Sequence, residues 1–163
     1  MNGSAATKIW ARLQGTAAGR WLFSRLVCWR APYFASISPT FEELVPDRAV
    51  VSMRRWRRVT NHIGTIHAIA MANLCEIAAG TLAEITTPSR MRWIPKGMTI
   101  QYLAKASGRI RATASMRTPA SGEVQDVVGG VDVHDQDHAR VVHADITMYL
   151  SPQPDINTPS SSV

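Results

Sequence analysis

The residues best suited to chemistry lie in one segment, NHIGTIHAIAMANLCEIAAG, which covers residues 61–80. Its polar landmarks, in order and at spacings of three, three and nine residues, are Asn61, Gly64, His67 and Glu76. Glu76 stands in an apolar run with no Lys or Arg nearby, although an unpaired carboxylate is costly to bury. Such a carboxylate is typical of a general base or a nucleophile. The alternative is a structural acid that is paired in the core.

The other landmarks also have structural alternatives. Asn61 is of a type favoured in turns, and Gly64 would permit a tight turn. His67 is more typical of a capping residue than of a base, and it lies on the opposite side of a helical wheel from Glu76. The two side chains are therefore not expected to form a dyad within one chain.

The segment that must position these residues is predicted to be a helix over residues 65–82, because small and aliphatic residues dominate it and it has no proline. Thr65 is expected to cap the start of this helix, and Gly80 to lie near its end. A helix that is apolar nearly all round is buried in a core or spans a membrane. His67 and Glu76 interrupt the run, so we predict a core helix.

The region before this helix is predicted to hold one strand. Residues 49–59, AVVSMRRWRRV, have high β-propensity, and residues 37–47, ISPTFEELVPD, read as a connector with two prolines. The basic run at 54–58 includes one tryptophan, but it is more typical of a solvated surface than of a nucleic-acid site, so no nucleic-acid partner is expected.

The region after the helix is predicted to be β-rich. Residues 97–106 and 109–116 alternate apolar and polar side chains, and residues 123–134 and 139–150 form a second hairpin across the polar turn DQDH. Covering an apolar helix on most sides requires a strongly curved sheet. The predicted fold class is therefore α+β, with a curved antiparallel sheet wrapped around one long central helix.

The two ends of the chain differ from the middle. Residues 5–30 read as one or two amphipathic helices, which are expected to pack on the domain or to rest on a membrane interface. The last residues are polar and rich in proline, so they are expected to be disordered. We predict three parts: a helical extension over 1–35, a domain over 36–150 and a tail over 151–163.

Charge and cysteine content bound the partners. The formal net charge is +6, and within residues 1–60 the only acids are Glu42, Glu43 and Asp47. This basic excess indicates an anionic partner (a phosphate, a nucleic acid or a membrane surface) or a solvated basic surface. The two cysteines are too far apart in sequence for a metal motif and indicate a reducing, cytoplasmic setting. Three histidines surround one predicted hairpin without metal-site spacing, so no metal site is expected; they are His134, His138 and His143.

The predicted architecture and the Asn-Gly-His-Glu pattern together resemble the hotdog fold of acyl-CoA thioesterases, over residues 37–150. The resemblance is strongest to the phenylacetate-type branch and to a related family of unknown function. It implies that Glu76 acts on a thioester as general base or nucleophile, while backbone N–H groups at the helix start hold the thioester oxygen. That branch commonly has two glycines after the histidine, where this chain has Ala68 and Ile69, and it commonly has Asp where this chain has Glu.

The resemblance also implies the partners. The expected ligand is a hydrophobic acyl-CoA, with coenzyme A present only as part of the substrate and no other cofactor. A homodimer or dimer of dimers is expected, with Asn61 of one chain near Glu76 of the other. The acyl group would be lined by Ile66, Ile69, Met71, Met98 and Ile100. The CoA phosphates would meet Lys105, Ser107, Gly108 and Arg109, for which ordinary exposure on a hairpin is the alternative. A second reading is a non-catalytic protein that binds acyl-CoA or lipid, and Ile69 favours it.

Overall fold

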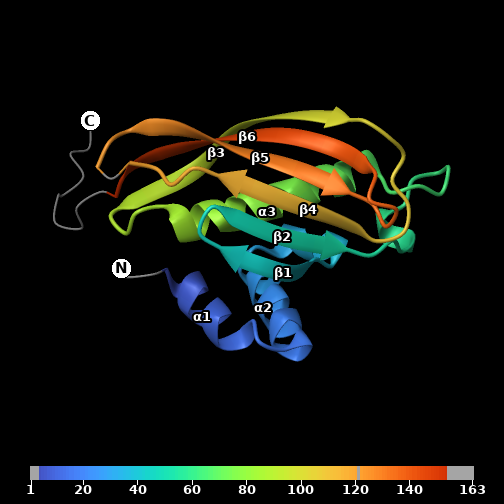
Figure 1. Ribbon diagram of the computed structural model, residues 1–163, viewed down its shortest axis with the longest axis horizontal. Helices are drawn as coiled ribbons and strands as arrows, with labels where there is room; N and C mark the ends of the chain where they lie inside the picture. Colours follow the sequence, from blue (N-terminus) through green and yellow to red (C-terminus); the bar gives the residue numbers. More distant parts are fainter. Residues whose placement is uncertain (1–3, 121, 154–163) are drawn as a thin grey trace, which may run out of the picture.

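Six strands form one antiparallel sheet that curves around helix α3 (Figure 1), in the order β1-β2-β4-β5-β6-β3. The computed structural model describes residues 4–120 and 122–153. In chain order the elements are α1 (Ala5–Leu13), α2 (Ala17–Arg30), the 3-10 turn η1 (Pro32–Ile37), β1 (Thr40–Val45), β2 (Arg48–Met53), the 3-10 turn η2 (Arg57–Val59), α3 (Ala68–Thr86), β3 (Met91–Tyr102), β4 (Ile110–Met116), β5 (Gln125–His134) and β6 (Arg140–Pro152).

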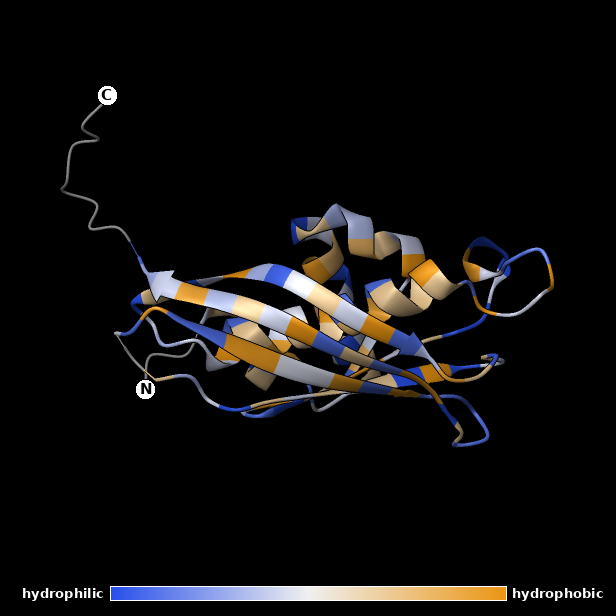
Figure 2. Ribbon diagram, turned by 90° about the horizontal axis from the view of Figure 1, so that it is seen from above, coloured by the Kyte–Doolittle hydropathy of each residue, from blue (hydrophilic) through white to orange (hydrophobic). Residues whose placement is uncertain are grey.

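The sheet has one buried face, because apolar and polar residues alternate along its strands. Figure 2 shows this alternation along β6, where the residues from Val142 to Leu150 are buried at every second position. The predicted hairpin across residues 135–138 is confirmed, since β5 and β6 pair along their whole length. The inner face of this sheet supplies one side of the core.

Helix α3 supplies the other side of the core. It packs mainly on β2, β4 and β5, and its side chains from Leu74 to Ala79 are buried except for Glu76. By length and composition α3 could cross a membrane, but most of its residues are buried within the fold. The predicted core helix inside a curved sheet is confirmed.

The N-terminal helices lie beside β1 (Figure 1), and three aromatic rings join them to the same core. Phe23 of α2 contacts Trp10 of α1 and Phe41 of β1 edge to face, with ring centroids 5.0 and 5.1 Å apart. The Ser24 hydroxyl accepts a 2.9 Å hydrogen bond from the backbone N–H of Phe41, and the guanidinium of Arg25 donates to the carbonyl of Pro39 at 2.7 Å. Helix α2 is thus bound to β1 by side chains and by backbone groups.

The strand pairing and several boundaries differ from those expected. Residues 97–106 and 109–116 do not form a hairpin, because β3 pairs with β6, whereas β4 pairs with β2 and β5. The predicted strand over 49–59 ends at Met53, because Arg55 donates its backbone N–H to the carbonyl of Gly108 in a loop and leaves the ladder. The predicted connector over 37–47 contains β1, which pairs with β2 through a bulge.

The central helix begins at Ala68 and continues to Thr86, so Gly80 lies inside it rather than near its end. β3 begins at Met91, earlier than expected, and β6 continues to Pro152. The predicted disordered tail therefore starts within a strand, and its residues 154–163 lie outside the described part of the chain.

Candidate functional site

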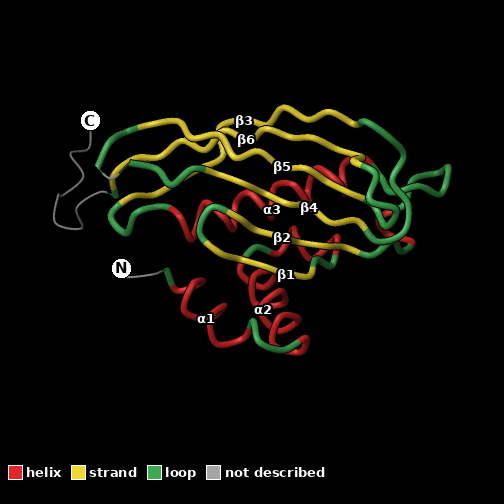
Figure 3. The backbone as a smooth tube through the Cα atoms, in the orientation of Figure 1, coloured by secondary structure: helices red, strands yellow, loops and turns green. Residues whose placement is uncertain are grey.

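Loops from three parts of the chain gather at one end of the sheet (Figure 3), around the start of α3. Ile66 donates its N–H to the carbonyl of Ala106 in the β3–β4 loop at 3.1 Å, and His67 donates to the carbonyl of Val59 at 2.8 Å. These bonds fix the direction from which the chain enters the helix. The predicted polar landmarks lie in and after this entry loop.

His67 is the N-cap of α3, as the capping alternative predicts. Its ring Nδ1 accepts the N–H of Ile69 at 3.1 Å, and its carbonyl accepts from Ala70 and Met71. The N–H of Ala68 has no acceptor among the described residues. Thr65, which was expected to cap the helix, instead accepts a hydrogen bond from the side chain of Asn61. In this first turn, the N–H of Ala68 is thus the one that no described residue accepts, and it lies at the positive end of the helix dipole, where a ligand can bind it.

Asn61 holds its own loop together. Its carbonyl oxygen Oδ1 accepts the backbone N–H groups of Ile63 and Thr65 at 3.1 Å, and its Nδ2 donates to the Thr65 hydroxyl at 2.8 Å. Gly64 has a φ of +80°, which is a left-handed conformation that glycine adopts without strain. Arg55 donates to the carbonyl of this glycine at 2.9 Å. Both landmarks therefore shape the entry loop, and neither reaches Glu76 within the same chain.

Glu76 lies on the exposed stripe of α3. On a wheel of 100° per residue, Ile69, Ala72 and Glu76 fall within about 60° of one another, and Gly80, which continues the same row, is buried. Ile69 is 57% exposed, and Ala72 and Glu76 are half-buried. The carboxylate of Glu76 forms no hydrogen bond or ion pair with any described residue. The acid is therefore available to a ligand or to a second chain.

Cys75, the neighbour of Glu76, is excluded as a nucleophile by its surroundings. Burial, reinforced by the charge of Asp132, raises the pKa of its thiol to about 12. A thiol that stays protonated and is completely buried cannot attack a substrate. Among the side chains in the middle of α3, Glu76 is the one that can accept a proton.

An open apolar surface flanks this stripe, because β3 is an edge strand that α3 covers only at its two ends. At one end, the ring of Trp93 lies over Gly80, and its Nε1 donates to Glu84 at 3.1 Å. At the other end, the hydroxyl of Tyr102 donates to the carbonyl of Ala68 at 3.3 Å. The middle of β3 therefore faces the helix turns that carry Glu76.

The inner face of this strand follows from its pairing with buried residues of β6. Met98 pairs with Ile146 and Ile100 with Ala144, so both point toward α3. Met98 is nevertheless 37% exposed, and Ile100 is half-buried. Together with Ile69 they form an apolar surface that no described residue covers. We call this surface, with Ala72 and Glu76, the α3–β3 face.

Two residues expected to line an acyl pocket do not reach this face. Ile66 and Met71 are 2% and 4% exposed and belong to the core. Sequence reasoning missed Trp93 and Tyr102, which close the two ends of the face. Trp93 could have been found from the alternation of side chains that starts at Met91, before the bulge between Pro95 and Gly97 interrupts it.

The residues expected to meet CoA phosphates lie in the β3–β4 loop and divide into two groups. Lys105 and Ser107 are exposed on either side of Ala106, whose carbonyl bonds to Ile66 at the helix start. Arg109 instead extends to Glu42, with Nη1 3.9 Å from Oε1. Gly108 makes the turn with a φ of +66°. Lys105 and Ser107 are thus the members of this set that remain near the start of α3.

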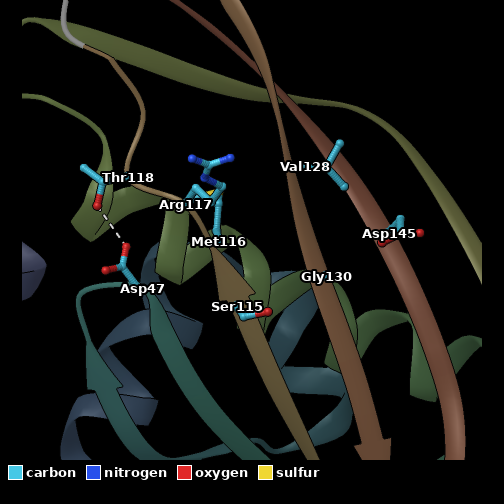
Figure 4. Close-up of a pocket in the computed structure, with 8 residues that line it drawn as sticks. All are labelled: Asp47, Ser115, Met116, Arg117, Thr118, Val128, Gly130 and Asp145. Carbon is cyan, nitrogen blue, oxygen red and sulfur yellow. Dashed lines mark hydrogen bonds between the residues drawn. The ribbon is translucent and has the colours of Figure 1, made fainter.

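A hollow of about 640 Å³ lies on the opposite face of the sheet (Figure 4). Ser115, Gly130 and Asp145 form one row across β4, β5 and β6, and the missing side chain of Gly130 leaves the space between the other two. Asp47 closes one side by accepting a 2.8 Å hydrogen bond from the Thr118 hydroxyl. The sheet separates this hollow from Glu76, so the hollow is not part of the candidate site. Within residues 4–120 and 122–153, no three His, Cys, Asp or Glu side chains are grouped as metal ligands.

Comparison with known proteins places this geometry in a family. A search of curated proteins finds no match. A solved structural-genomics protein is 42% identical, with a TM-score of 0.79 over 91% of this chain and 98% of its own. A thioesterase from Haemophilus influenzae has a TM-score of 0.71 at 12% identity, over 82% of this chain and 91% of its own.

A hypothetical thioesterase from Streptococcus pneumoniae, solved with coenzyme A, has a TM-score of 0.62 at 16% identity, over 78% of this chain and 99% of its own. These similarities show the hotdog fold of thioesterase-family proteins, as the resemblance implied. The model of one family matches residues 19–150, and on that match the chain belongs to the family described as a domain of unknown function, DUF4442.

Proposed function

We propose that this protein hydrolyses the thioester of a hydrophobic acyl-CoA, with Glu76 as the general base or nucleophile. The observation that carries the proposal is a half-buried carboxylate on the open apolar α3–β3 face that has no hydrogen-bond or ion-pair partner among the described residues. The apolar side chains would receive the acyl group, and the carboxylate would act on the carbonyl carbon or on a water beside it. The thioesterases that share the fold, one of them solved with coenzyme A, support the same ligand class.

The start of α3 supplies the second element of this chemistry. The N–H of Ala68 has no acceptor in the described chain and lies at the positive end of the helix. In the base mechanism, Glu76 takes a proton from water as the oxygen attacks, and negative charge collects on the carbonyl oxygen near this N–H. The C–S bond then breaks, and the CoA thiol leaves with a proton. Tyr102 holds the carbonyl of Ala68 and so positions the same peptide turn.

These two elements require two chains. Glu76 and the N–H of Ala68 are separated by eight residues, or about 12 Å along the helix, which is too far for both to contact one thioester carbonyl. A two-fold axis near Ala72 would place two α3 helices antiparallel and bring Glu76 of one subunit opposite Ala68 of its partner. Ala72 has a small side chain that permits this close approach.

The open edge of β3 is a suitable second contact for the same dimer. The first half of β3 contains Pro95, a bulge and Lys96, which are features that discourage edge pairing. The second half, 97–102, has none of them and carries the exposed Met98 and Tyr102. We propose antiparallel pairing of two such segments across the two-fold axis, which also covers the apolar α3–β3 face.

The CoA portion would lie toward the β3–β4 loop. Lys105 is exposed there beside the start of α3, and it carries no ion pair within the described residues. No cofactor beyond the CoA of the substrate is needed for hydrolysis. The two cysteines, Cys28 and Cys75, are both free and buried, which fits the cytoplasmic location that we propose.

The test is thiol release from a panel of acyl-CoAs by the wild type, by Glu76→Gln and by Glu84→Gln. Glu84 is a matched control, because it is an exposed carboxylate two turns along the same helix, and Gln at this position keeps an oxygen that can accept from Trp93 Nε1. We expect Glu76→Gln to slow thiol release by about 100-fold or more, as for loss of a general base. Glu84→Gln is expected to leave it unchanged. Equal rates for all three proteins would refute the role of Glu76.

A non-catalytic acyl-CoA-binding function is the second candidate, and Ile69 favours it. This side chain is 57% exposed directly beside the free N–H of Ala68, where it narrows the approach of a thioester. If no acyl-CoA releases thiol but calorimetry detects binding, this second function replaces the first.

A further inference from the structure

Helix α2 is apolar on both of its sides, which is unusual for a helix on the surface of a protein. Its inner side carries Phe23 and Cys28, which are buried against the rest of the fold. An ordinary surface helix has polar residues on the opposite side. Here the outer side carries four large apolar residues, Trp21 at 59%, Leu22 at 42%, Leu26 at 41% and Trp29 at 81% exposure.

These four residues form one continuous stripe. On a wheel of 100° per residue they fall within about 140°, and Arg25 and Arg30 lie within or next to that arc. Tyr33, at 69% exposure, follows in the turn η1 directly after the helix. We call Trp21, Leu22, Leu26, Trp29 and Tyr33 the α2 stripe. Its contiguity and its aromatic content distinguish it from scattered surface apolar residues.

The charged side chains of the two helices α1 and α2 are all positive. No acid precedes Glu42 in the sequence, and the cations before it are Lys8, Arg12, Arg20, Arg25 and Arg30. Arg20 and Arg25 are hydrogen-bonded to backbone carbonyls of the N-terminal region. Lys8, Arg12 and Arg30 are exposed and have no ion pair among the described residues.

We propose that the α2 stripe docks the protein on an anionic lipid bilayer. Tryptophan, tyrosine and leucine insert into the interfacial region of a bilayer, and flanking Arg and Lys side chains bind acidic headgroups. A second copy of this chain is disfavoured as the occupant, because a two-fold contact would bring the same uncompensated cations together. An acidic lipid surface matches both the apolar stripe and the charge around it.

The stripe is separate from the candidate catalytic site. α2 packs on β1, at one end of the strand order, whereas β3 forms the other end. The turn η1 after α2 contacts α3, where Asn73 donates a 3.1 Å hydrogen bond to Ser36, but it does not pair with β3. A dimer built through β3 leaves the α2 stripe of each subunit uncovered, and two stripes on one dimer would strengthen binding by multivalency. Membrane docking therefore does not depend on thioester hydrolysis, and each can fail without the other.

The experiment measures co-sedimentation of the full chain with vesicles of phosphatidylcholine alone and with 30% phosphatidylglycerol. Two variants test the stripe, Trp21→Ala with Trp29→Ala, and Arg12→Gln with Arg30→Gln. Their matched controls are Trp56→Ala, which removes an exposed tryptophan elsewhere, and Arg90→Gln with Arg117→Gln, which removes the same charge elsewhere. Circular dichroism checks that every variant is folded.

We expect binding to the anionic vesicles that falls with added salt, and little binding to phosphatidylcholine alone. Each test variant should lower the partition coefficient about tenfold or more. For the arginine variant, the reason is that each cation near an acidic surface contributes about 1 kcal/mol. The control variants should bind like the wild type.

Three results would overturn the proposal. One is absence of binding to anionic vesicles, including the case in which oligonucleotides bind instead. Another is an equal loss in the test and control variants, which would indicate only a general effect of net charge. The third is a fall in oligomeric state on removal of Trp21 and Trp29, measured by light scattering, which would show that a second copy covers the stripe.

Discussion

The contact between the N-terminal helices and the sheet gives a sharp prediction about stability. Trp10, Phe23 and Phe41 are at most 4% exposed, and their rings meet edge to face. Replacing Phe23 by Leu keeps the site apolar but removes the ring contacts, so it should cost about 1–3 kcal/mol of unfolding free energy. Replacing Trp10 by Leu should cost less, because its Nε1 is buried without an acceptor among the described residues and its removal ends that penalty.

The assay is urea unfolding of the wild type, the two single variants and the double variant at one fixed protein concentration, because a dimer makes stability depend on concentration. The coupling energy from this cycle should be about 0.5–1.5 kcal/mol, the range of an aromatic pair beyond its buried area. Trp29→Leu, on the exposed side of α2, is the control and should change stability by less than about 0.5 kcal/mol. All variants should unfold in a single transition. A coupling near zero, or a separate early transition for the helices, would refute the idea that they share the core.

Two further predictions concern the dimer and the response to pH. Ala72→Phe should yield folded monomers that release no thiol, because the larger side chain prevents two α3 helices from approaching each other. If light scattering still shows a dimer, the two-chain site is contradicted. Burial opposes ionisation of Glu42, but the hydrogen bond from Arg111 at 2.6 Å and the charges of Arg111 and Arg109 hold the pKa of this carboxyl below its ordinary value of 4.5. The ion pair therefore stabilises the fold above that value, and its contribution is lost as the pH falls through the folded pKa. Glu42→Gln should lower the stability at neutral pH and flatten the decline in stability below about pH 4.5. Parallel urea midpoints for both proteins across that pH range would refute this.

The sequence of elements along the chain, strands on either side of one apolar helix, could be predicted, since periodicity reports directly which side of each element is buried. The order of strands within the sheet could not, because β3 pairs with β6 at the far edge rather than with the next strand, β4. β1 could not, because Pro39 and Pro46 flank it and Glu42 and Glu43 interrupt its apolar residues. An outer strand tolerates all four, since its outward side chains meet solvent and its ends need no ladder partner.

The candidate site was predictable to a similar degree. The acid could be found because it breaks an apolar run, and the capping alternative for His67 also holds. The predicted helix start is three residues early, at Thr65 instead of Ala68. The open face beside Glu76 was not predictable, since it depends on how far β3 curves from α3. The same limit applies to Arg109, whose pairing with Glu42 on β1 depends on two strands that meet only in the folded sheet.

The link between α2 and β1 has a consequence for how far this protein can polymerise. Ser24 accepts the backbone N–H of Phe41 in β1, and Arg25 binds the carbonyl of Pro39 just before this strand, whereas β3 has no such cover in the described chain. Two chains joined through β3 form a longer sheet with a β1 strand at each end, and both ends are then capped by an α2 helix. In the proposed dimer, α2 would therefore oppose edge-to-edge growth beyond two chains and the extension of the sheet into a fibre. A chain without α2 would keep a second open edge and lose that stop.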